Sequence, residues 1–210
     1  MAEIIRKFID ESSLYAIWKI TESVDELHGS IELKAREEEL YRSFVAESRK
    51  KQWLAYRILI RKLLEPQEFP VEYDEVGKPF LAGSHYHISV SHTGDLAAVI
   101  MSSKGKVGID LEKIRPRIEN VKDKFMNDYE LGRLIQGHEL EQMTLTWCAK
   151  EALYKLYGIR TLDFRHHMTV EVPARTGLNF HARIDFGGKK NDYQLFSELE
   201  GDCVLVYLHE

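Results

Sequence analysis

Two stretches of this chain, WLAYRILIR at 53–61 and WCAKEALYK at 147–155, carry Trp, Ala, Leu and a terminal basic residue at the same spacing. Their apolar residues recur at the three- and four-residue steps of an amphipathic helix. Each stretch precedes several short runs in which apolar and polar residues alternate, as they do in β-strands. A long helix followed by strands, occurring twice, predicts an α+β protein with two similar α/β lobes, residues 1–104 and 105–210.

The expected elements follow from these patterns. After a turn at 76–79, the runs YHISVSH and LAAVIMS predict a β-hairpin, and VGIDLE at 107–112 follows as a third strand that ends before Pro116. Four more strand-like runs come after Gly158: HMTVEV, LNFHARIDF, YQLFSEL and CVLVYLH. The predicted helices are 32–47, 49–64, 120–137 and 140–158, with a break between the first two near Ser48.

The composition suits a chain that builds a substantial core. Of its 210 residues, 44% are hydrophobic, which is enough for one large core or two small cores packed together. The net charge of −5 argues against nucleic acid as the main partner. No secretory leader and no long apolar window occur, so we expect a cytoplasmic protein without membrane association. Cys148 and Cys203 lack metal-binding spacing and are expected to be buried thiols.

The segment VGIDLE places two carboxylates two positions apart in an otherwise apolar run. In a strand, Asp110 and Glu112 share one face, about 6 to 7 Å apart, while Ile109 and Leu111 lie on the other. At an effective dielectric constant near 20 the repulsion of the two charges costs roughly 2.5 kcal/mol, which water or a cation must offset. Oxygen ligands without a neighbouring His or Cys favour Mg²⁺. A solvent-facing acidic pair on an edge strand is the alternative interpretation.

The segment WCAKEALYK offers one carboxylate between two ammonium groups. On a helix, Glu151 is adjacent to Lys150 and lies four residues before Lys155, which would make an ordinary surface ion pair. The apolar residues interleaved with these charges leave little of the helix for solvent. Partly enclosed lysines are good partners for phosphate oxygens, so a phosphate site is the second interpretation.

Three other segments can be read as anion sites. In ISVSHTG, His92 lies at the end of an apolar strand face, beside Ser91. It is either a core or turn residue whose hydrogen bonds are satisfied within the protein, or a donor to an anion. GKPF at 77–80 is a turn that carries one cation. Residues 48–64 include six basic and no acidic side chains, which is typical of a solvated helix face and also compatible with an anion site.

Taken in order, GKPF, ISVSH, VGIDLE and WCAKEALYK resemble the 4′-phosphopantetheinyl transferase superfamily. Its pattern is G-I-D-[LIV]-E followed by W-x-x-K-E-[AS]-x-x-K, and here Lys150 lies 40 residues after Asp110. The chain length and the repeated halves resemble the monomeric, two-lobe Sfp-like type. This resemblance implies two α/β lobes related by pseudo-twofold symmetry, with the active site and the coenzyme A site in the cleft between them.

The resemblance also implies a reaction and its participants. Phosphopantetheine would pass from coenzyme A to a serine of an apo acyl or peptidyl carrier protein, releasing adenosine 3′,5′-bisphosphate. Mg²⁺ would be held by Asp110, Glu112 and Glu151 together with the coenzyme A diphosphate. The proton of the carrier serine would go to Glu151, or through a water molecule to Glu130. The implied catalytic residues are Glu151, Lys155, Lys150, His92 and Glu130.

The implied contacts with coenzyme A come from several segments. Lys150, Lys155, Ser91 and His92 would contact its phosphates, Lys78 and Pro79 its adenosine end, and Arg49, Lys50 or Lys51 its 3′-phosphate. The acidic run 37–39 departs from the family, whose members have basic residues at this place. The basic stretches 49–62 and 115–117 are candidate docking surfaces for an acidic carrier protein. Two rival hypotheses are a Mg²⁺-dependent coenzyme A or nucleotide phosphohydrolase and a coenzyme A-binding module without catalytic activity.

Overall fold

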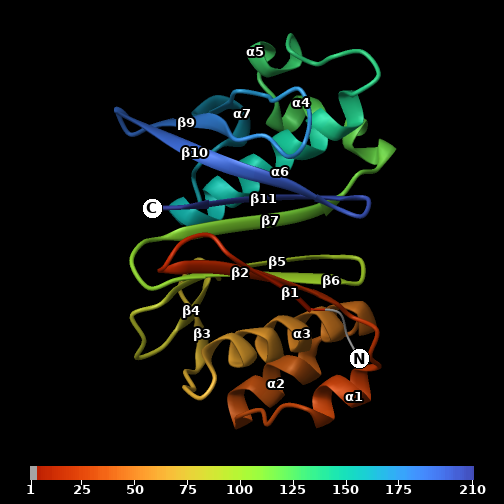
Figure 1. Cartoon of the computed structure of the whole chain (residues 1–210), viewed down its shortest axis with the longest axis vertical. Coiled ribbons are helices and arrows are strands. Elements are labelled where there is room, and N and C mark those ends of the chain that lie inside the picture. Colours follow the sequence, from red (N-terminus) through yellow and green to blue (C-terminus); the bar gives the residue numbers. More distant parts are fainter. Residues whose placement is uncertain (1–3) are drawn as a thin grey trace.

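A computed structural model describes residues 4–210 and shows two antiparallel β-sheets packed against each other, with helices outside them (Figure 1). The first sheet has the order β1-β2-β6-β5, formed by Ile4–Phe8, Ser13–Lys19, Leu96–Ser102 and His87–Thr93. The second has the order β7-β11-β10-β9-β8, formed by Val107–Lys113, Cys203–His209, Lys189–Glu200, Phe180–Phe186 and Met168–Val170. A two-stranded ribbon of β3 (Val71–Tyr73) and β4 (Pro79–Leu81) lies at the side of the first sheet.

Two long helices dominate the α-helical part. Helices α1 (Val24–Gly29), α2 (Ala35–Ser43) and α3 (Glu47–Leu64) cover the outer side of the first sheet (Figure 1). Helix α6 (Glu139–Tyr157) packs on β7 and β11 of the second sheet. The remaining helical turns are η1 (Pro116–Asn120), α4 (Lys122–Phe125), α5 (Asp128–Leu131) and α7 (Phe164–His167). No helix among residues 4–210 is long and apolar enough to cross a membrane.

The apolar residues form separate cores on the two sides of each sheet. Trp53, Leu59 and Val99 belong to a core between α3 and the first sheet. Leu153, Ile184 and Val206 belong to a core between α6 and the second sheet. A third core lies between the sheets and joins Tyr15, Ile17, Ala98 and Ile100 to Ile109, Leu111, Leu205 and Tyr207. This third core makes the two sheets one packed unit.

The predicted α+β class and most predicted elements are confirmed. The hairpin of β5 and β6 forms around Gly94, and α6 begins and ends within one residue of the predicted bounds. The break between α2 and α3 lies at residues 44–46, slightly before Ser48. The lobe boundary at residue 104 and the pseudo-twofold relation stay predictions; residue 104 falls in the turn between β6 of the first sheet and β7 of the second.

One predicted element was wrong, and two strands were not predicted. The helix expected over 120–137 is broken into the short turns α4 and α5, and a capping box from Asn127 and Glu130 starts the second of them. The predicted strand VGIDLE is confirmed as β7, which pairs with β11 from the end of the chain. Strands β1 and β2 were not predicted, because charged residues interrupt the alternation in the first of them.

Candidate active site

A cavity of about 330 Å³ lies where α3, the β3–β4 turn, β5, β7 and α6 meet. It therefore takes residues from both halves of the sequence. Its charged or titratable lining residues near the predicted motifs are Arg49, His92, Asp110, Glu112, Glu151 and Lys155. Three of the quoted motifs thus face one cavity, and Gly77 and Pro79 bring the fourth to its edge.

Gly108 explains how α6 comes so close to β7. A Cβ atom on Gly108 would lie 2.1 Å from the carbonyl oxygen of Ala152, which is a backbone atom and cannot be moved aside by a side-chain rotation. The glycine therefore lets the helix rest directly on the strand. This contact sets Glu151 and Lys155 of α6 beside Asp110 and Glu112, which follow Gly108 on the same face of β7.

The two oxygens of Asp110 have different surroundings. Oδ1 accepts hydrogen bonds from Ser91 Oγ at 2.8 Å and from Lys155 Nζ at 2.7 Å. Oδ2 is buried and has no hydrogen-bond partner within residues 4–210. A buried acceptor without a partner is costly, so this oxygen is suited to receive a ligand. Lys155 also donates to the backbone oxygen of Ile109 at 3.0 Å, which holds its ammonium group over the strand.

The two glutamates of the cavity have raised proton affinities. Burial raises the pKa of Glu151 to about 7, and the charge of Asp110 acts in the same direction. Burial also raises the pKa of Glu112, which accepts a hydrogen bond from Thr93 Oγ1 at 3.1 Å. The strand prediction that Asp110 and Glu112 share one face and repel each other agrees with this lining and with these shifts.

His92 is a neutral imidazole at the mouth of β5. Burial, and after it the nearby charge of Arg49, lowers the pKa of His92 to about 4. Arg49 Nη1 donates to His92 Nε2. Because a guanidinium only donates, Nε2 accepts and the proton of the ring lies on Nδ1. Arg49 and His92 together give the cavity one permanent cation and one neutral imidazole.

Lys150 and Glu130, both predicted as catalytic, are placed outside the cavity. Lys150 is fully buried and donates to Glu130 Oε2 at 2.7 Å and to the backbone oxygens of Phe125, Phe164 and Met168 at 2.7, 2.8 and 3.2 Å. Glu130 also accepts from the backbone amides of Asn127 and Val170, both at 2.8 Å. All donors and acceptors of this pair are engaged inside the protein.

Helix geometry gives the reason for this placement. Residues five apart on an α-helix differ in direction by roughly 140°, whereas residues four apart lie on one face. Glu151 and Lys155 therefore share the cavity face of α6, and Lys150 points away from it into the segment that carries α4 and α5. Lys150 and Glu130 are therefore not among the residues that line the cavity, and their catalytic roles stay predictions.

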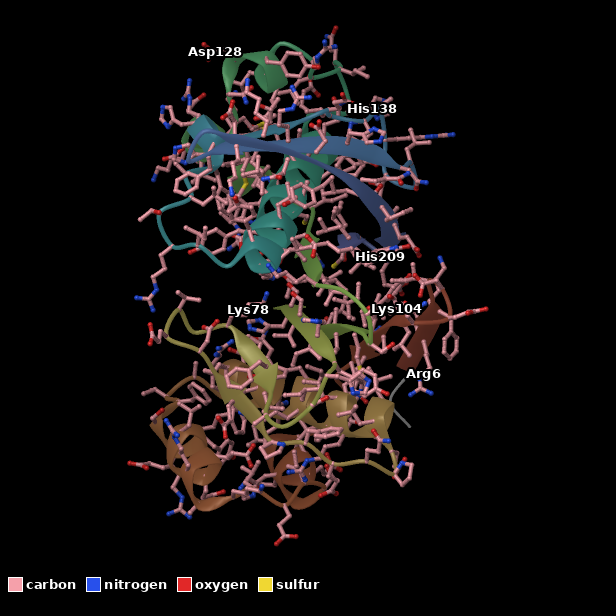
Figure 2. All side chains as sticks on the ribbon, turned by 90° about the vertical axis from the view of Figure 1, so that its left-hand side faces the viewer. Arg6, Lys78, Lys104, Asp128, His138 and His209 are labelled. Atoms are coloured by element: carbon pink, nitrogen blue, oxygen red, sulfur yellow. The ribbon has the colours of Figure 1, made fainter. Side chains whose placement is uncertain are left out.

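The remaining basic candidates, Lys50, Lys51 and Lys78, do not line the cavity. Lys51 Nζ lies 3.4 Å from Glu47, and Lys50 Nζ lies 5.2 Å from the centre of the Tyr41 ring, so neither lines the cavity. Lys78, labelled near the junction of the two halves in Figure 2, lines a neighbouring cavity of about 260 Å³ and has its pKa lowered by burial. Pro79 lines both cavities.

The cavity also contains residues that sequence reasoning missed. Tyr56 lies seven residues after Arg49 on the same face of α3, a spacing that could have pointed to it. Tyr73 comes from the β3–β4 ribbon, and its hydroxyl accepts from Trp53 Nε1 at 3.0 Å and bonds with that of Tyr56. Nothing in the sequence indicates that the ribbon would close over α3 in this way.

A larger cavity of about 490 Å³ lies between α2 and β3, away from the motifs. Its charged lining residues are Lys34, Arg36, Arg57, Glu37, Glu39 and Glu72, so opposite charges balance there. The buried Arg57 pairs with Glu37 and does not reach the smaller cavity. The smaller cavity is therefore the better candidate, because it alone of these two collects the carboxylates of VGIDLE and WCAKEALYK.

The chain resembles known proteins over its second half and part of its first. Residues 106–207 match the model of the 4′-phosphopantetheinyl transferase superfamily. The 4′-phosphopantetheinyl transferase AcpT of Salmonella typhi is 36% identical over 117 residues, which are 52% of this chain and 60% of that protein. AcpT of Escherichia coli O157:H7 is 32% identical over 135 residues, 59% and 69% of the two chains. The 4′-phosphopantetheinyl transferase HetI of Nostoc is 29% identical over 130 residues, 55% of each.

The matching segment contains most of the cavity's acidic and basic residues, including those of VGIDLE and WCAKEALYK. The chain spans about 60% of the length of the Salmonella relative and just over two thirds of the Escherichia coli relative. The motifs, the matched segment and the relatives agree: this chain belongs to the 4′-phosphopantetheinyl transferase superfamily.

Proposed function

We propose that this protein transfers the phosphopantetheine group of coenzyme A to a serine of an apo acyl or peptidyl carrier protein. The observation that carries the proposal is the joint cavity, in which three carboxylates face two cations. Carboxylates suit a hard metal ion, and cations beside them suit the phosphates that such an ion bridges. The related proteins are named 4′-phosphopantetheinyl transferases, which supports the same reaction here.

The transfer is a displacement at phosphorus. The oxygen of the carrier serine attacks the phosphorus that bears pantetheine, and the bond from this phosphorus to the bridging oxygen of the diphosphate breaks. Adenosine 3′,5′-bisphosphate leaves with that oxygen, and the serine proton must pass to a base. Glu151 is the base we favour, because it lines the cavity, whereas Glu130 is buried outside it.

The chain's own residues hold the substrate for this step. We assign the coenzyme A phosphates to Lys155, Arg49 and His92, since all three line the cavity. Arg49 is the candidate for the 3′-phosphate, because Lys50 and Lys51 are turned toward Tyr41 and Glu47. Positioning by such contacts supplies most of the catalysis in phosphoryl-type transfers.

The donor set fits Mg²⁺. Among residues 4–210, no three His, Cys, Asp or Glu side chains converge into a ready-made metal cluster. Mg²⁺ usually takes one or two protein carboxylates and completes its coordination with water and substrate phosphate. Asp110, whose Oδ2 is buried and unpartnered in the described part of the chain, and Glu112 would hold it, with Glu151 as the third predicted ligand. When bound, Mg²⁺ would neutralise charge that builds on the leaving phosphate.

The carrier protein is proposed to dock beside the cavity. A second groove of about 380 Å³ shares Glu112 and Trp147 with the cavity and carries basic and apolar residues: Lys113, Arg115, Arg117, Ile118 and Val121. An acidic helix with an apolar face would complement this lining.

We further propose that the protein acts as a monomer in the cytoplasm, as its Sfp-like type suggests.

Replacing Arg115 and Arg117 together by alanine should raise KM for a carrier protein several-fold and leave KM for coenzyme A unchanged. Added salt should raise the wild-type KM for the carrier more than that of the variant, because exposed charges are screened. Lys190→Ala, which removes a cation of β10 paired with Asp185, is the control and should change neither constant. An unchanged carrier KM in the double variant would exclude this docking surface.

The transfer itself is tested by intact-protein mass spectrometry. Purified apo acyl and peptidyl carrier proteins are incubated with this protein, coenzyme A and Mg²⁺, with a parallel sample in EDTA. We expect the mass of one phosphopantetheine to be added to a carrier, and EDTA to prevent it. Coenzyme A cleavage without carrier modification would favour the phosphohydrolase instead. Coenzyme A binding without either reaction, on several classes of carrier, would favour the binding module.

A further inference from the structure

Strands β5 and β7 are edge strands of different sheets, and they meet beside the cavity. Three hydroxyl residues, Ser89, Ser91 and Thr93, alternate along β5 and therefore lie on its same face. Each of them forms a hydrogen bond to β7. We call this row of hydroxyls the seam between the two sheets. Its side chains form the hydrogen bonds to β7 that the backbone of a neighbouring strand would otherwise form.

The three hydroxyls differ in what they bind. Ser89 Oγ accepts from the backbone amide of Ile109 at 3.3 Å. Ser91 Oγ accepts from the amide of Leu111 at 3.1 Å and donates to Asp110 Oδ1 at 2.8 Å. Thr93 Oγ1 donates to Glu112 Oε2 at 3.1 Å. The first bond joins only backbone to side chain, while the other two residues reach the carboxylates of the cavity.

We propose that Ser91 and Thr93 are positioning residues that orient Asp110 and Glu112 for a divalent metal ion. This inference rests on the proposed function only in that it takes these carboxylates as the metal ligands. It replaces the sequence-based expectation that Ser91 contacts a phosphate of coenzyme A. Ser91 is 6% exposed, and its hydroxyl is already engaged on both sides.

The number of hydrogens that Ser91 can donate supports this change of role. A serine hydroxyl has one hydrogen, and that of Ser91 is donated to Asp110. The Leu111 amide bonds to the same oxygen and thereby fixes the direction of the remaining donor. Ser91 therefore has no hydrogen left for a phosphate oxygen, which needs a donor. The Ser91 hydroxyl orients the carboxylate of Asp110 instead.

The same bonds give the two oxygens of Asp110 different roles. Ser91 and Lys155 both bind Oδ1, and Oδ2 has no partner in the described residues. With Oδ1 anchored, the carboxylate cannot rotate freely and Oδ2 keeps its direction. Partners that anchor metal-binding carboxylates in this way typically improve metal affinity by 10- to 100-fold. We expect an effect near the lower end, because Lys155 anchors the same oxygen.

The test compares two serines on one strand. Mn²⁺ binding to the full-length protein is measured by electron paramagnetic resonance, without and with coenzyme A, using coenzyme A alone as the blank. Ser91→Ala should weaken Mn²⁺ binding about tenfold. Ser89→Ala is the matched control: it removes a hydroxyl of the same seam that contacts no carboxylate, and Mn²⁺ affinity should stay within about threefold of the wild type, since only the seam is altered.

Thr93 supplies an independent comparison. Thr93→Val keeps the shape of the side chain but removes the donor to Glu112, and it should weaken Mn²⁺ binding. Thr93→Ser keeps the hydroxyl and should bind Mn²⁺ like the wild type. Thermal unfolding of each protein in EDTA shows whether it folds. Ser91→Ala should lose more thermal stability than Ser89→Ala, because its hydroxyl forms two hydrogen bonds and that of Ser89 forms one, but only Ser91→Ala should lose metal affinity.

Two results would overturn the inference. If Ser91→Ala and Ser89→Ala weaken Mn²⁺ binding equally, the hydroxyls only join the sheets. If the wild-type protein binds no Mn²⁺ in either condition, the carboxylates are not a metal site. Neither measurement contains a carrier protein, so a wild type that binds Mn²⁺ but modifies no carrier would reject the proposed transfer and leave this inference standing.

Discussion

At the scale of single residues, the cavity concentrates more negative than positive charge near α6. Asp110, Glu112 and Glu151 share the cavity with Lys155, whose ammonium group binds Asp110. Ionising Glu151 therefore adds a charge that burial and Asp110 both oppose, and this is why its pKa rises to about 7. Without a metal ion, the folded protein should hold a proton there under mildly acidic conditions.

The first prediction concerns the pH dependence of stability through Glu151. Its carboxyl has an ordinary pKa of 4.5 in an unfolded chain and about 7 in the folded protein, so the folded state binds the proton more tightly. This contribution to stability is complete below about pH 4.5 and is lost as the pH rises to 7. The whole change is roughly 3 kcal/mol at most. Glu151→Gln, which mimics the neutral carboxyl, should be more stable than the wild type at pH 8 and similar at pH 5.

Urea unfolding in EDTA at these two pH values measures the difference between wild type and variant. Titrating groups that do not interact with Glu151 affect both proteins alike and cancel in this difference. Glu139→Gln, in the first turn of the same helix, is the control for replacing a glutamate by its amide. A stability difference between Glu151→Gln and wild type that is the same at pH 5 and pH 8 would contradict the raised pKa.

At the scale of elements, the approach of α6 to β7 decides where the chemistry lies. Gly108→Ala should destabilise the protein by about 3 kcal/mol, because the new methyl group would meet the backbone oxygen of Ala152 and the helix would have to move. Gly29→Ala is the matched control: nothing lies within 4 Å of its added Cβ, and the residue ends α1. Urea unfolding of both variants tests the contact; equal stabilities would show that α6 does not depend on Gly108.

The buried pair of Lys150 and Glu130 should act on stability rather than on substrate binding. Lys150→Met leaves Glu130 buried without its cation and three carbonyl groups without their donor, which should cost about 3 to 5 kcal/mol. The exposed pair of Arg183 and Asp192 is the comparison, and Arg183→Ala should cost at most about 1 kcal/mol.

Coenzyme A titration by calorimetry, at a temperature where Lys150→Met is folded, separates the two roles of Lys150. An affinity close to that of the wild type is expected, because the lysine lies outside the cavity. A tenfold or larger loss of affinity in a variant of unchanged secondary structure would restore Lys150 to the phosphate-binding residues. Lys155→Met should lose affinity in the same experiment, since Lys155 lines the cavity.

These residues show which features of the fold and the site could be predicted from the sequence. The spacing of VGIDLE and WCAKEALYK predicted a strand and a helix, and β7 and α6 confirm both. The direction of Lys150 could not be predicted, because it depends on which side of α6 packs on β7. The partner of β7 could not be predicted either, since β11 comes from the far end of the chain. The hydrogen bonds of the Ser91 hydroxyl to β7 could not be predicted, because they are tertiary contacts.

At the scale of the whole molecule, the two halves are joined by more than the cavity. The core between the sheets takes Ile100 from the first sheet and Leu205 from the second, and Lys7 Nζ bonds Glu198 across them at 2.6 Å. The hydroxyl seam of β5 and β7 adds polar contacts at the edge. A site built from both halves requires them to keep a fixed relation, and this shared core supplies it.

Such a shared core predicts that the protein unfolds in one cooperative transition. Two of the three tryptophans, Trp18 and Trp53, lie in the core beside α3, and Trp147 lies on α6. In Trp147→Phe, fluorescence therefore reports the first half alone, while far-ultraviolet circular dichroism reports all helices and strands. The two signals should give the same midpoint in urea. Ile100→Ala in that variant should lower both midpoints together, because it opens a cavity between the sheets, whereas separate transitions would mean that the halves fold independently.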